Sequence, residues 1–193
     1  TGLISVLERY SVHHLYEIGV RAHTTFSDTF YLVVRAQDIQ TTLMKTGSRI
    51  IVGDVTLSVL SPDKIYENTY ASKRNNLSVN VLLEYGETRI LFTGDAEADI
   101  EALVGPRAGD VDVLKVGHHG SLTSTSTLFL QTIDPEFALI SAGRENRYGH
   151  PHPAILHRLA ETGAIVYRTD QHGDVLLTSY GGEPSIEAHP LPF

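Results

Sequence analysis

The amino-acid sequence predicts an α/β fold in which helices cover a mixed sheet. Early in the chain, β-prone segments are joined by short turns such as Gly53-Asp54 and Gly86-Glu87, which is typical of hairpins. From about residue 96 onward, helical and β-prone segments alternate, which is typical of strands joined by helices. Because no internal repeat interrupts this order, we expect one domain over residues 1–180, followed by an extended tail over 181–193.

The first quarter of the chain predicts two helices and a short strand. Apolar residues recur at helical spacing from Leu3 to Tyr10, which predicts a helix that begins with the chain itself. Since no capping residue stands before this helix, we expect that a preceding segment of the protein is missing. A strand over 12–16 follows, and a second helix is predicted over 29–44, where Gly47 stops it.

The rest of the chain supplies the predicted sheet. Hairpins are expected over 49–60 and 77–92, and the polar stretch 64–76 between them is long enough for a functional surface loop. The alternating helices and strands that follow are predicted over 96–104, 111–116, 126–133, 137–141, 154–162, 164–168 and 175–179.

The composition excludes several classes of function. Asp and Glu number 23 against 15 Lys and Arg, and the net charge of −8 excludes a nucleic-acid binder that uses a broad basic surface. The chain has no cysteine, so any transition metal must be held by His, Asp or Glu. Its apolar runs are far shorter than the ~20 residues of a membrane-spanning helix. The 10 histidines, four of them in two tight groups, direct attention to metal or acid–base chemistry.

Two polar segments directly follow apolar strands. Asp95 ends the segment Thr93-Gly94-Asp95, where a carboxylate can hold a cation, although it could equally be the N-cap of a helix starting at Ala96. His118 and His119 lie between two glycines, which let the backbone turn sharply. Neutral imidazoles at such a turn favour metal binding over two solvated side chains.

Two further segments are candidates for binding substrate. Arg147, Tyr148, His150 and His152 share the loop that follows the strand over 137–141, and this combination suits an oxyanion or a phosphate. His152-Pro153 is also a plausible helix start. Asn76 and Ser78 can orient a substrate, but such residues equally make turns. The remaining histidines are expected to be surface or turn residues: His13, His14, His23, His157, His172 and His189.

Taken together, these segments resemble a known family. The motifs occur in the order Asn76-x-Ser78, Thr93-Gly94-Asp95, Leu114-Lys115-Val116-Gly117-His118-His119-Gly120-Ser121, Asn146-Arg147-Tyr148-Gly149-His150-Pro151-His152-Pro153 and Tyr167-Arg168-Thr169-Asp170-x-x-Gly173. In this order they resemble the metallo-β-lactamase-like domain of the ComEC family of DNA-uptake competence proteins. The resemblance implies an αβ/βα sandwich and a two-metal hydrolase site. The family's His-x-His-x-Asp-His motif is absent here, and Thr1-Gly2-Leu3 matches the short Gly-Leu segment that comes directly after that motif in the family. The first strands are therefore expected to be missing.

The resemblance also implies roles for the candidate residues. Asp95 would bridge two divalent ions, zinc or manganese, and His119 or else His118 would complete the coordination of one. His150 would ligate an ion or donate a hydrogen bond to the phosphate. The residues implied in positioning the substrate are Asn76, Ser78, Arg147 and His152.

These roles lead to three hypotheses. In the first, the intact protein is a nuclease that acts on single-stranded DNA during uptake, with a membrane channel in the same protein; the side of the membrane stays open. In the second, it hydrolyses small phosphodiesters or lactones, since Tyr148 is the one aromatic residue in the site loops and no base-stacking platform is evident. In the third, it is an inactive binding or assembly module. We expect the 193-residue chain alone to be inactive.

Overall fold

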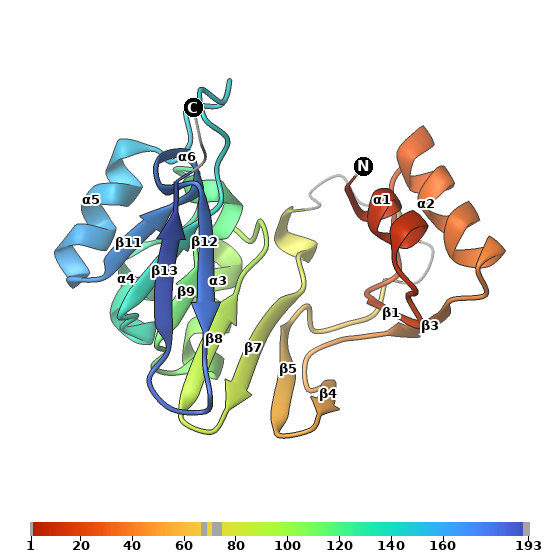
Figure 1. The fold of residues 1–193 in the computed structure, drawn as a ribbon, viewed down its shortest axis with the longest axis horizontal. Coiled ribbons are helices and arrows are strands. Elements are labelled where there is room, and N and C mark those ends of the chain that lie inside the picture. The colour runs from red at the N-terminus through yellow and green to blue at the C-terminus, as the bar shows by residue number, and fades with distance from the viewer. Residues whose placement is uncertain (1, 67–68, 71–74, 191–193) are drawn as a thin grey trace.

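The computed structural model describes residues 2–66, 69–70 and 75–190, and a seven-stranded sheet forms its centre (Figure 1). In spatial order its strands are β11 (Ile165–Arg168), β10 (Phe137–Ile140), β9 (Val113–Lys115), β8 (Thr88–Phe92), β7 (Asn80–Tyr85), β5 (Val55–Ser61) and β4 (Arg49–Val52). Neighbouring strands are antiparallel from β4 to β8 and parallel from β8 to β11. The predicted mixed sheet is therefore confirmed.

Three helices accompany the parallel part of the sheet: α3 (Ala98–Ala108), α4 (Thr127–Ile133) and α5 (Pro153–Thr162). The two central strands among them, β9 and β10, are apolar except for Lys115 at the end of β9, as expected where a sheet is buried on both faces. Leu114 of β9, Leu130 of α4 and Leu159 of α5 are fully buried in one continuous core. This core fixes the positions of the loops that follow the strands.

A smaller N-terminal part lies beside this sheet, on the right in Figure 1. It consists of α1 (Gly2–Arg9), β1 (His14–Glu17), β2 (Val20–Arg21), α2 (Thr25–Ala36) and β3 (Gln40–Leu43). Strands β1 and β3 pair in parallel, and α1 packs on α2. Its buried core consists of three side chains, Leu7, Val34 and Ile39, with partly buried neighbours.

The helix predicted over 29–44 is wrong in its second half. The chain leaves α2 after Ala36, turns at Asp38 with φ 52°, and continues as β3. Aspartate tolerates this left-handed conformation better than most residues. Residues 40–43 (Gln-Thr-Thr-Leu) then pair with β1, so a contact distant in sequence prevails over the local apolar spacing.

The C-terminal segment differs from the expected tail. Residues 174–178 form β12 (Asp174–Thr178), and β13 (Ser185–His189) pairs with it as an antiparallel hairpin. A short helix, α6 (Thr169–His172), precedes the hairpin. The turn of the hairpin reaches the β7–β8 turn, where the Glu87 amide donates to the Gly181 carbonyl over 2.8 Å. A Cβ atom at Gly86 would lie 2.3 Å from that carbonyl oxygen, so this contact requires glycine.

Part of the predicted loop over 64–76 lies outside the described residues. Within the rest, β6 (Thr69–Tyr70) pairs with β2, and Asn75–Leu77 form a single 3-10 turn, η1. No helix among the described residues is long and apolar enough to cross a membrane.

Candidate metal-binding site at the ends of the parallel strands

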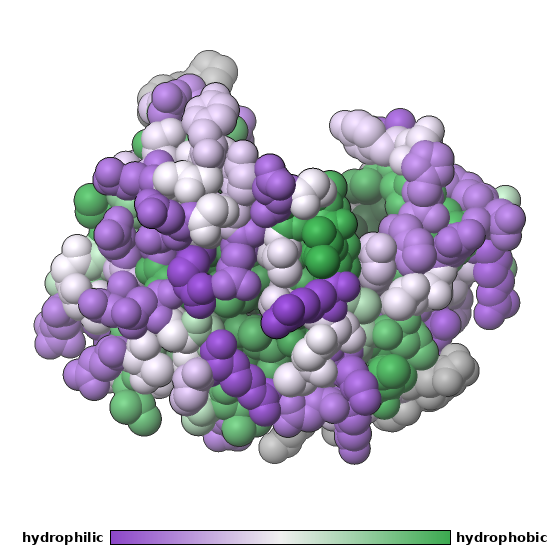
Figure 2. Space-filling model, turned by 90° about the horizontal axis from the view of Figure 1, so that it is seen from below, coloured by the Kyte–Doolittle hydropathy of each residue, from purple (hydrophilic) through white to green (hydrophobic). Residues whose placement is uncertain are grey.

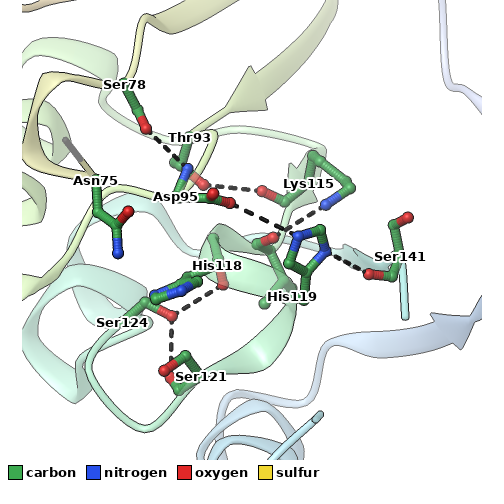
Figure 3. A network of polar contacts seen from close by, with 12 residues as sticks. Asn75, Ser78, Thr93, Asp95, Lys115, His118, His119, Ser121, Ser124 and Ser141 are labelled. Atoms are coloured by element: carbon green, nitrogen blue, oxygen red, sulfur yellow. Dashed lines mark hydrogen bonds and ion pairs between the residues drawn. The ribbon is translucent and has the colours of Figure 1, made fainter. Parts of the chain in front are cut away.

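Three neighbouring parallel strands carry the candidate residues on the loops that follow them. Thr93-Gly94-Asp95 follows β8, the 3-10 segment η2 (Gly117–Gly120) follows β9, and Ser141 follows β10. Because the carboxyl ends of parallel strands meet at one edge of a sheet, these loops lie side by side, as Figure 3 shows. The candidate residues that follow β8 and β9 therefore lie at the edge where the sequence predicted them.

Asp95 and His119 face each other at this edge (Figure 3). The His119 Nε2 atom lies 3.8 Å from Asp95 Oδ1, and the two side chains are 52% and 46% exposed. The other ring nitrogen, His119 Nδ1, lies 2.7 Å from the Ser141 carbonyl oxygen. Since a carbonyl can only accept, Nδ1 carries the proton, and in the neutral ring Nε2 presents its lone pair toward the carboxylate. Metal-binding histidines in proteins are held in this way.

The loop that carries Asp95 is held by the residues before β7. The Asp95 amide donates to Ser78 Oγ over 3.0 Å, and the Glu97 amide donates to Asn76 Oδ1 over 3.2 Å. The alternative that Asp95 caps a helix is wrong, because α3 begins at Ala98 and Glu97 is its N-cap residue. The Asp95 carboxylate is therefore turned toward His119 instead of the helix.

The two adjacent histidines have an unusual backbone. His118 and His119 lie in the left-handed region, with φ 48° and 56°, whereas the sequence led us to expect that the flanking glycines would make the turn. Left-handed conformations of residues other than glycine cost of the order of 1–3 kcal/mol each and concentrate at functional sites. The His118 amide donates to the Gly94 carbonyl over 2.9 Å, so the Asp95 loop itself helps to hold this turn.

The two members of the histidine doublet make different contacts. His119 meets Asp95, whereas the His118 ring lies edge-on to the His150 ring, with the ring centres 5.9 Å apart. His118 Nδ1 also lies 3.4 Å from Thr123 Oγ1. Of the two ligands left open by the sequence, the geometry favours His119.

His150 lies next to His118, in surroundings that disfavour the protonated imidazole. Burial lowers the pKa of its imidazole, and repulsion from His118, His119 and His152 lowers it further. Its Nδ1 atom is buried and has no hydrogen-bond partner among the described residues. Unpaired buried polar atoms are rare in native proteins, so this nitrogen is consistent with a site that is completed by a ligand.

Two other residues of the same loop have structural contacts. His152 is the N-cap of α5, since its Nδ1 accepts from the Ala154 amide over 3.2 Å. We therefore assign His152 to the helix rather than to substrate. Arg147 does not reach Asp95; its Nη2 donates to Tyr148 Oη over 2.6 Å.

Two residues that the sequence analysis gave no role support the site. Lys115, at the end of β9, is largely buried; burial lowers the pKa of its ammonium group, and the Asp95 carboxylate opposes that shift. The Thr169 hydroxyl donates to the Ala142 carbonyl over 2.8 Å and accepts from the Ala142 amide over 2.9 Å. Thr169 thereby fixes the segment whose Ser141 carbonyl orients His119. Both residues occur within the motifs that carry the family resemblance, and this was the one signal in the sequence that could have pointed to them.

The donor set fits a divalent ion in part. Bonds from nitrogen or oxygen to zinc are about 2.0–2.2 Å long, so His119 Nε2 and Asp95 Oδ1, 3.8 Å apart, are within reach of one ion. These donors also suit manganese. However, the described residues contain no group of three or more His, Cys, Asp or Glu side chains that could hold a metal. Among the described residues, Asp95 and His119 alone therefore do not make a complete ligand set for a metal ion.

Comparison with solved structures identifies the fold. The chain superposes on a protein of Parabacteroides distasonis described as a metal-dependent hydrolase, with a TM-score of 0.51 and 9% identity, over 85% of this chain and 79% of that one. At this identity the likeness shows the fold alone. The chain has the metallo-β-lactamase-like fold.

Sequence relatives identify the family, although no family model matches the chain. ComE operon protein 3 of Bacillus subtilis is 40% identical over 134 residues, which are 68% of this chain and 17% of that protein. Recombination protein 2 of Haemophilus influenzae is 39% identical over 67% of this chain, and Competence protein ComA of Neisseria gonorrhoeae is 37% identical over 56%; the matches cover 16% and 17% of those proteins. The chain belongs to the metallo-β-lactamase-like domains of the ComEC family.

Proposed function

We propose that this chain is part of a metal-dependent phosphodiesterase, a nuclease that degrades one DNA strand during uptake of DNA by competent bacteria. The observation that carries the proposal is the Asp95–His119 pair, whose imidazole is oriented by the Ser141 carbonyl. The competence relatives support DNA as the polymer involved. A bound dication would also offset the net charge of −8, which otherwise repels nucleic acid.

The residues of the site take distinct roles in this proposal. Asp95 and His119 would hold a divalent ion, zinc or manganese, and Asp95 would also serve a second ion. Such ions activate a water molecule near neutral pH and stabilise the charge that develops on a phosphate. Ser78 and Asn76 act as positioning residues, because their contacts are with the backbone of the Asp95 loop. His150 would donate a hydrogen bond to a phosphate oxygen.

The remaining ligands are proposed to come from a His-x-His-x-Asp-His segment elsewhere in the parent protein. The reason is the incomplete donor set, since two of the described side chains converge and more than two are needed for a catalytic ion. The same observation favours the alternative of an inactive binding or assembly module, if the parent protein lacks that segment. The nucleotide sequence upstream of Thr1 distinguishes the two.

The decisive experiment compares cleavage of single-stranded DNA by the parent domain, with manganese, for the wild type and Asp95→Ala. Loss of a ligand that stabilises the transition state by several kcal/mol predicts a rate lower by about a thousandfold or more. Asp99→Ala, in the exposed first turn of α3, is the matched control and should cleave at the wild-type rate. Equal rates for wild type and Asp95→Ala would refute the role of Asp95. Hydrolysis of small phosphodiesters or lactones without DNA cleavage would favour the second hypothesis.

A further inference from the structure

A cavity of about 380 Å³ opens beside His119 and Ser141. Its walls come from the segment after β10 and from the loop before α5, and they include Ala142, Asn146, Tyr148 and His150. This volume is near the small end of the range for pockets that enclose compact organic ligands. Because His119 belongs both to the cavity wall and to the Asp95–His119 pair, a ligand in the cavity lies next to the proposed reaction centre.

The cavity carries an aromatic surface at its rim. The Tyr148 ring is 66% exposed, and it stacks on His150 with the ring planes 18° apart and the centres separated by 5.9 Å. The Arg147 guanidinium lies 4.9 Å from the centre of the Tyr148 ring. A large exposed aromatic side chain is costly to leave in water, and an exposed tyrosine beside an arginine is typical of surfaces that stack nucleobases.

The loop that carries this surface is well anchored. The His150 amide donates to Asn146 Oδ1 over 3.0 Å, and Asn146 Nδ2 donates back to the His150 carbonyl over 2.6 Å. Pro151 packs against Gly120, where a Cβ atom would lie 2.6 Å away. The aromatic surface is therefore fixed relative to the turn that carries His119. A ligand bound on this surface would be held in a defined place next to His119.

We propose that this cavity is a nucleobase-binding subsite, in which Tyr148 stacks on a base of single-stranded nucleic acid while Arg147 contacts the adjacent phosphate or the outer face of that base. The inference rests on the proposed function, because it places a phosphate of the same nucleotide at Asp95 and His119. It assigns to Tyr148 the discrimination of nucleic acid from small phosphodiesters that lack a base. One stacking tyrosine thus supplies the platform that the sequence did not make evident.

The experiment measures binding and not cleavage. Fluorescence anisotropy of the 193-residue chain, in EDTA and near physiological ionic strength, which screens the net charge of −8, gives the Kd of a labelled oligothymidylate and of the same strand with abasic sites. Tyr148→Ala should raise the Kd of the oligothymidylate by about 5- to 150-fold, which corresponds to the stacking of one base. It should leave the Kd of the abasic strand unchanged, and Tyr148→Phe should bind like the wild type. Tyr180→Ala, which removes a tyrosine that is 90% exposed on the β12–β13 turn, should have no effect on either strand.

Three outcomes would overturn the inference: no binding of the oligothymidylate by the wild type, no weakening by Tyr148→Ala, or an equal weakening for both strands. The last outcome would mean that Tyr148 acts through the backbone of the strand. Circular dichroism of each variant checks that it folds, which the exposure of Tyr148 leads us to expect. The binding test contains no metal and the cleavage test requires one, so the two proposals can fail independently. Binding that depends on Tyr148 without any cleavage would refute the nuclease proposal alone. Cleavage by the parent domain without such binding would refute the subsite alone.

Discussion

The two parts of the molecule differ in how firmly they hold their residues. Around the parallel strands, sixteen buried side chains form one core, and the candidate site lies on its edge. In the N-terminal part, three buried side chains form the core, while Leu3, Phe26 and Leu32 stay exposed. Figure 2 shows larger apolar patches in the middle and on the right of the view than on the left, where polar residues dominate. Polar site residues, two of them in strained conformations, are found where the core is large enough to hold them.

The largest expected effect tests this difference directly. Leu114→Ala in β9 should lower the free energy of unfolding by about 4–5 kcal/mol, because the close-packed core around it cannot collapse into the cavity. Leu7→Ala in α1 should cost only about 2–3 kcal/mol, since its small and partly exposed core can rearrange. Urea denaturation followed by circular dichroism measures both values. Equal losses would show that the two cores are equally rigid.

A smaller effect is expected at the ion pair that follows β11. Arg168 binds both oxygens of the largely buried Asp170, at 3.0 and 2.6 Å, and these hydrogen bonds hold the pKa of Asp170 below its ordinary value. Asp170→Asn should therefore cost about 1–3 kcal/mol at pH 7. Because the pKa is lower in the folded state, this stability is present above the unfolded pKa of about 3.9 and is lost as the pH falls below it.

The measurement is urea denaturation of wild type and Asp170→Asn as a function of pH, where the two curves should converge in acid. The control is Asp63→Asn, which breaks the exposed Asp63–Arg107 pair near the N-terminal part. Its stability should change little, because exposed ion pairs contribute little. A constant difference between wild type and Asp170→Asn down to acid pH would contradict the assigned cause of the shift.

Two serines whose hydroxyl oxygens each accept a backbone hydrogen bond, one at the candidate site and one between β3 and β4, give a further comparison. Ser78 Oγ accepts from the Asp95 amide over 3.0 Å, and Ser48 Oγ accepts from the Lys45 amide over 3.1 Å. Substitution of either by alanine should cost about 0.5–1.5 kcal/mol in unfolding free energy. Only Ser78→Ala should also lower DNA cleavage by the metal-loaded parent domain, by about 10- to 100-fold, because it supports a proposed ligand. Unchanged cleavage by Ser78→Ala would remove its positioning role.

The smallest effect concerns backbone strain. Asp38 and His118 both have left-handed backbones, with φ 52° and 48°. Asp38→Gly should raise the free energy of unfolding by about 0.5–1 kcal/mol, since glycine takes this conformation without a steric penalty. His118→Gly should raise it less, because it also removes the ring contact with His150. Thermal unfolding compares the two, and an equal gain would mean that this ring contact contributes no stability.

The parts of the fold that sequence reasoning predicted are those whose signals are local. The hairpins, the alternating helices and strands, and the convergence of Asp95 with His119 follow from apolar runs and from which residue ends each strand. The strand β13 pairs with the neighbouring β12 in a hairpin, but the three prolines after Gly181 led to the expectation of a tail. The mistaken helix over 29–44 depends on a partner distant in the sequence, because β3 pairs with β1. The spacing of apolar residues within one segment does not reveal which distant segment it pairs with.

The site shows the same division. The approach of Asp95 to His119 was predicted, because both residues follow strands that are neighbours in the sheet. The supports were not, since Lys115 and Thr169 look like ordinary strand and turn residues and act through contacts across the fold. The left-handed histidines were also missed, because a sequence that places glycines beside them predicts that the glycines make the turn.

The contact between Thr169 and Ala142 has a consequence for how the protein is made. A chain leaves the ribosome N-terminal end first, so Asp95 and His119 are synthesised well before the threonine that braces the segment behind them. Ser78 can hold the Asp95 loop from early in synthesis, whereas the segment that carries the Ser141 carbonyl, the acceptor of His119 Nδ1, lacks its brace until Thr169 emerges.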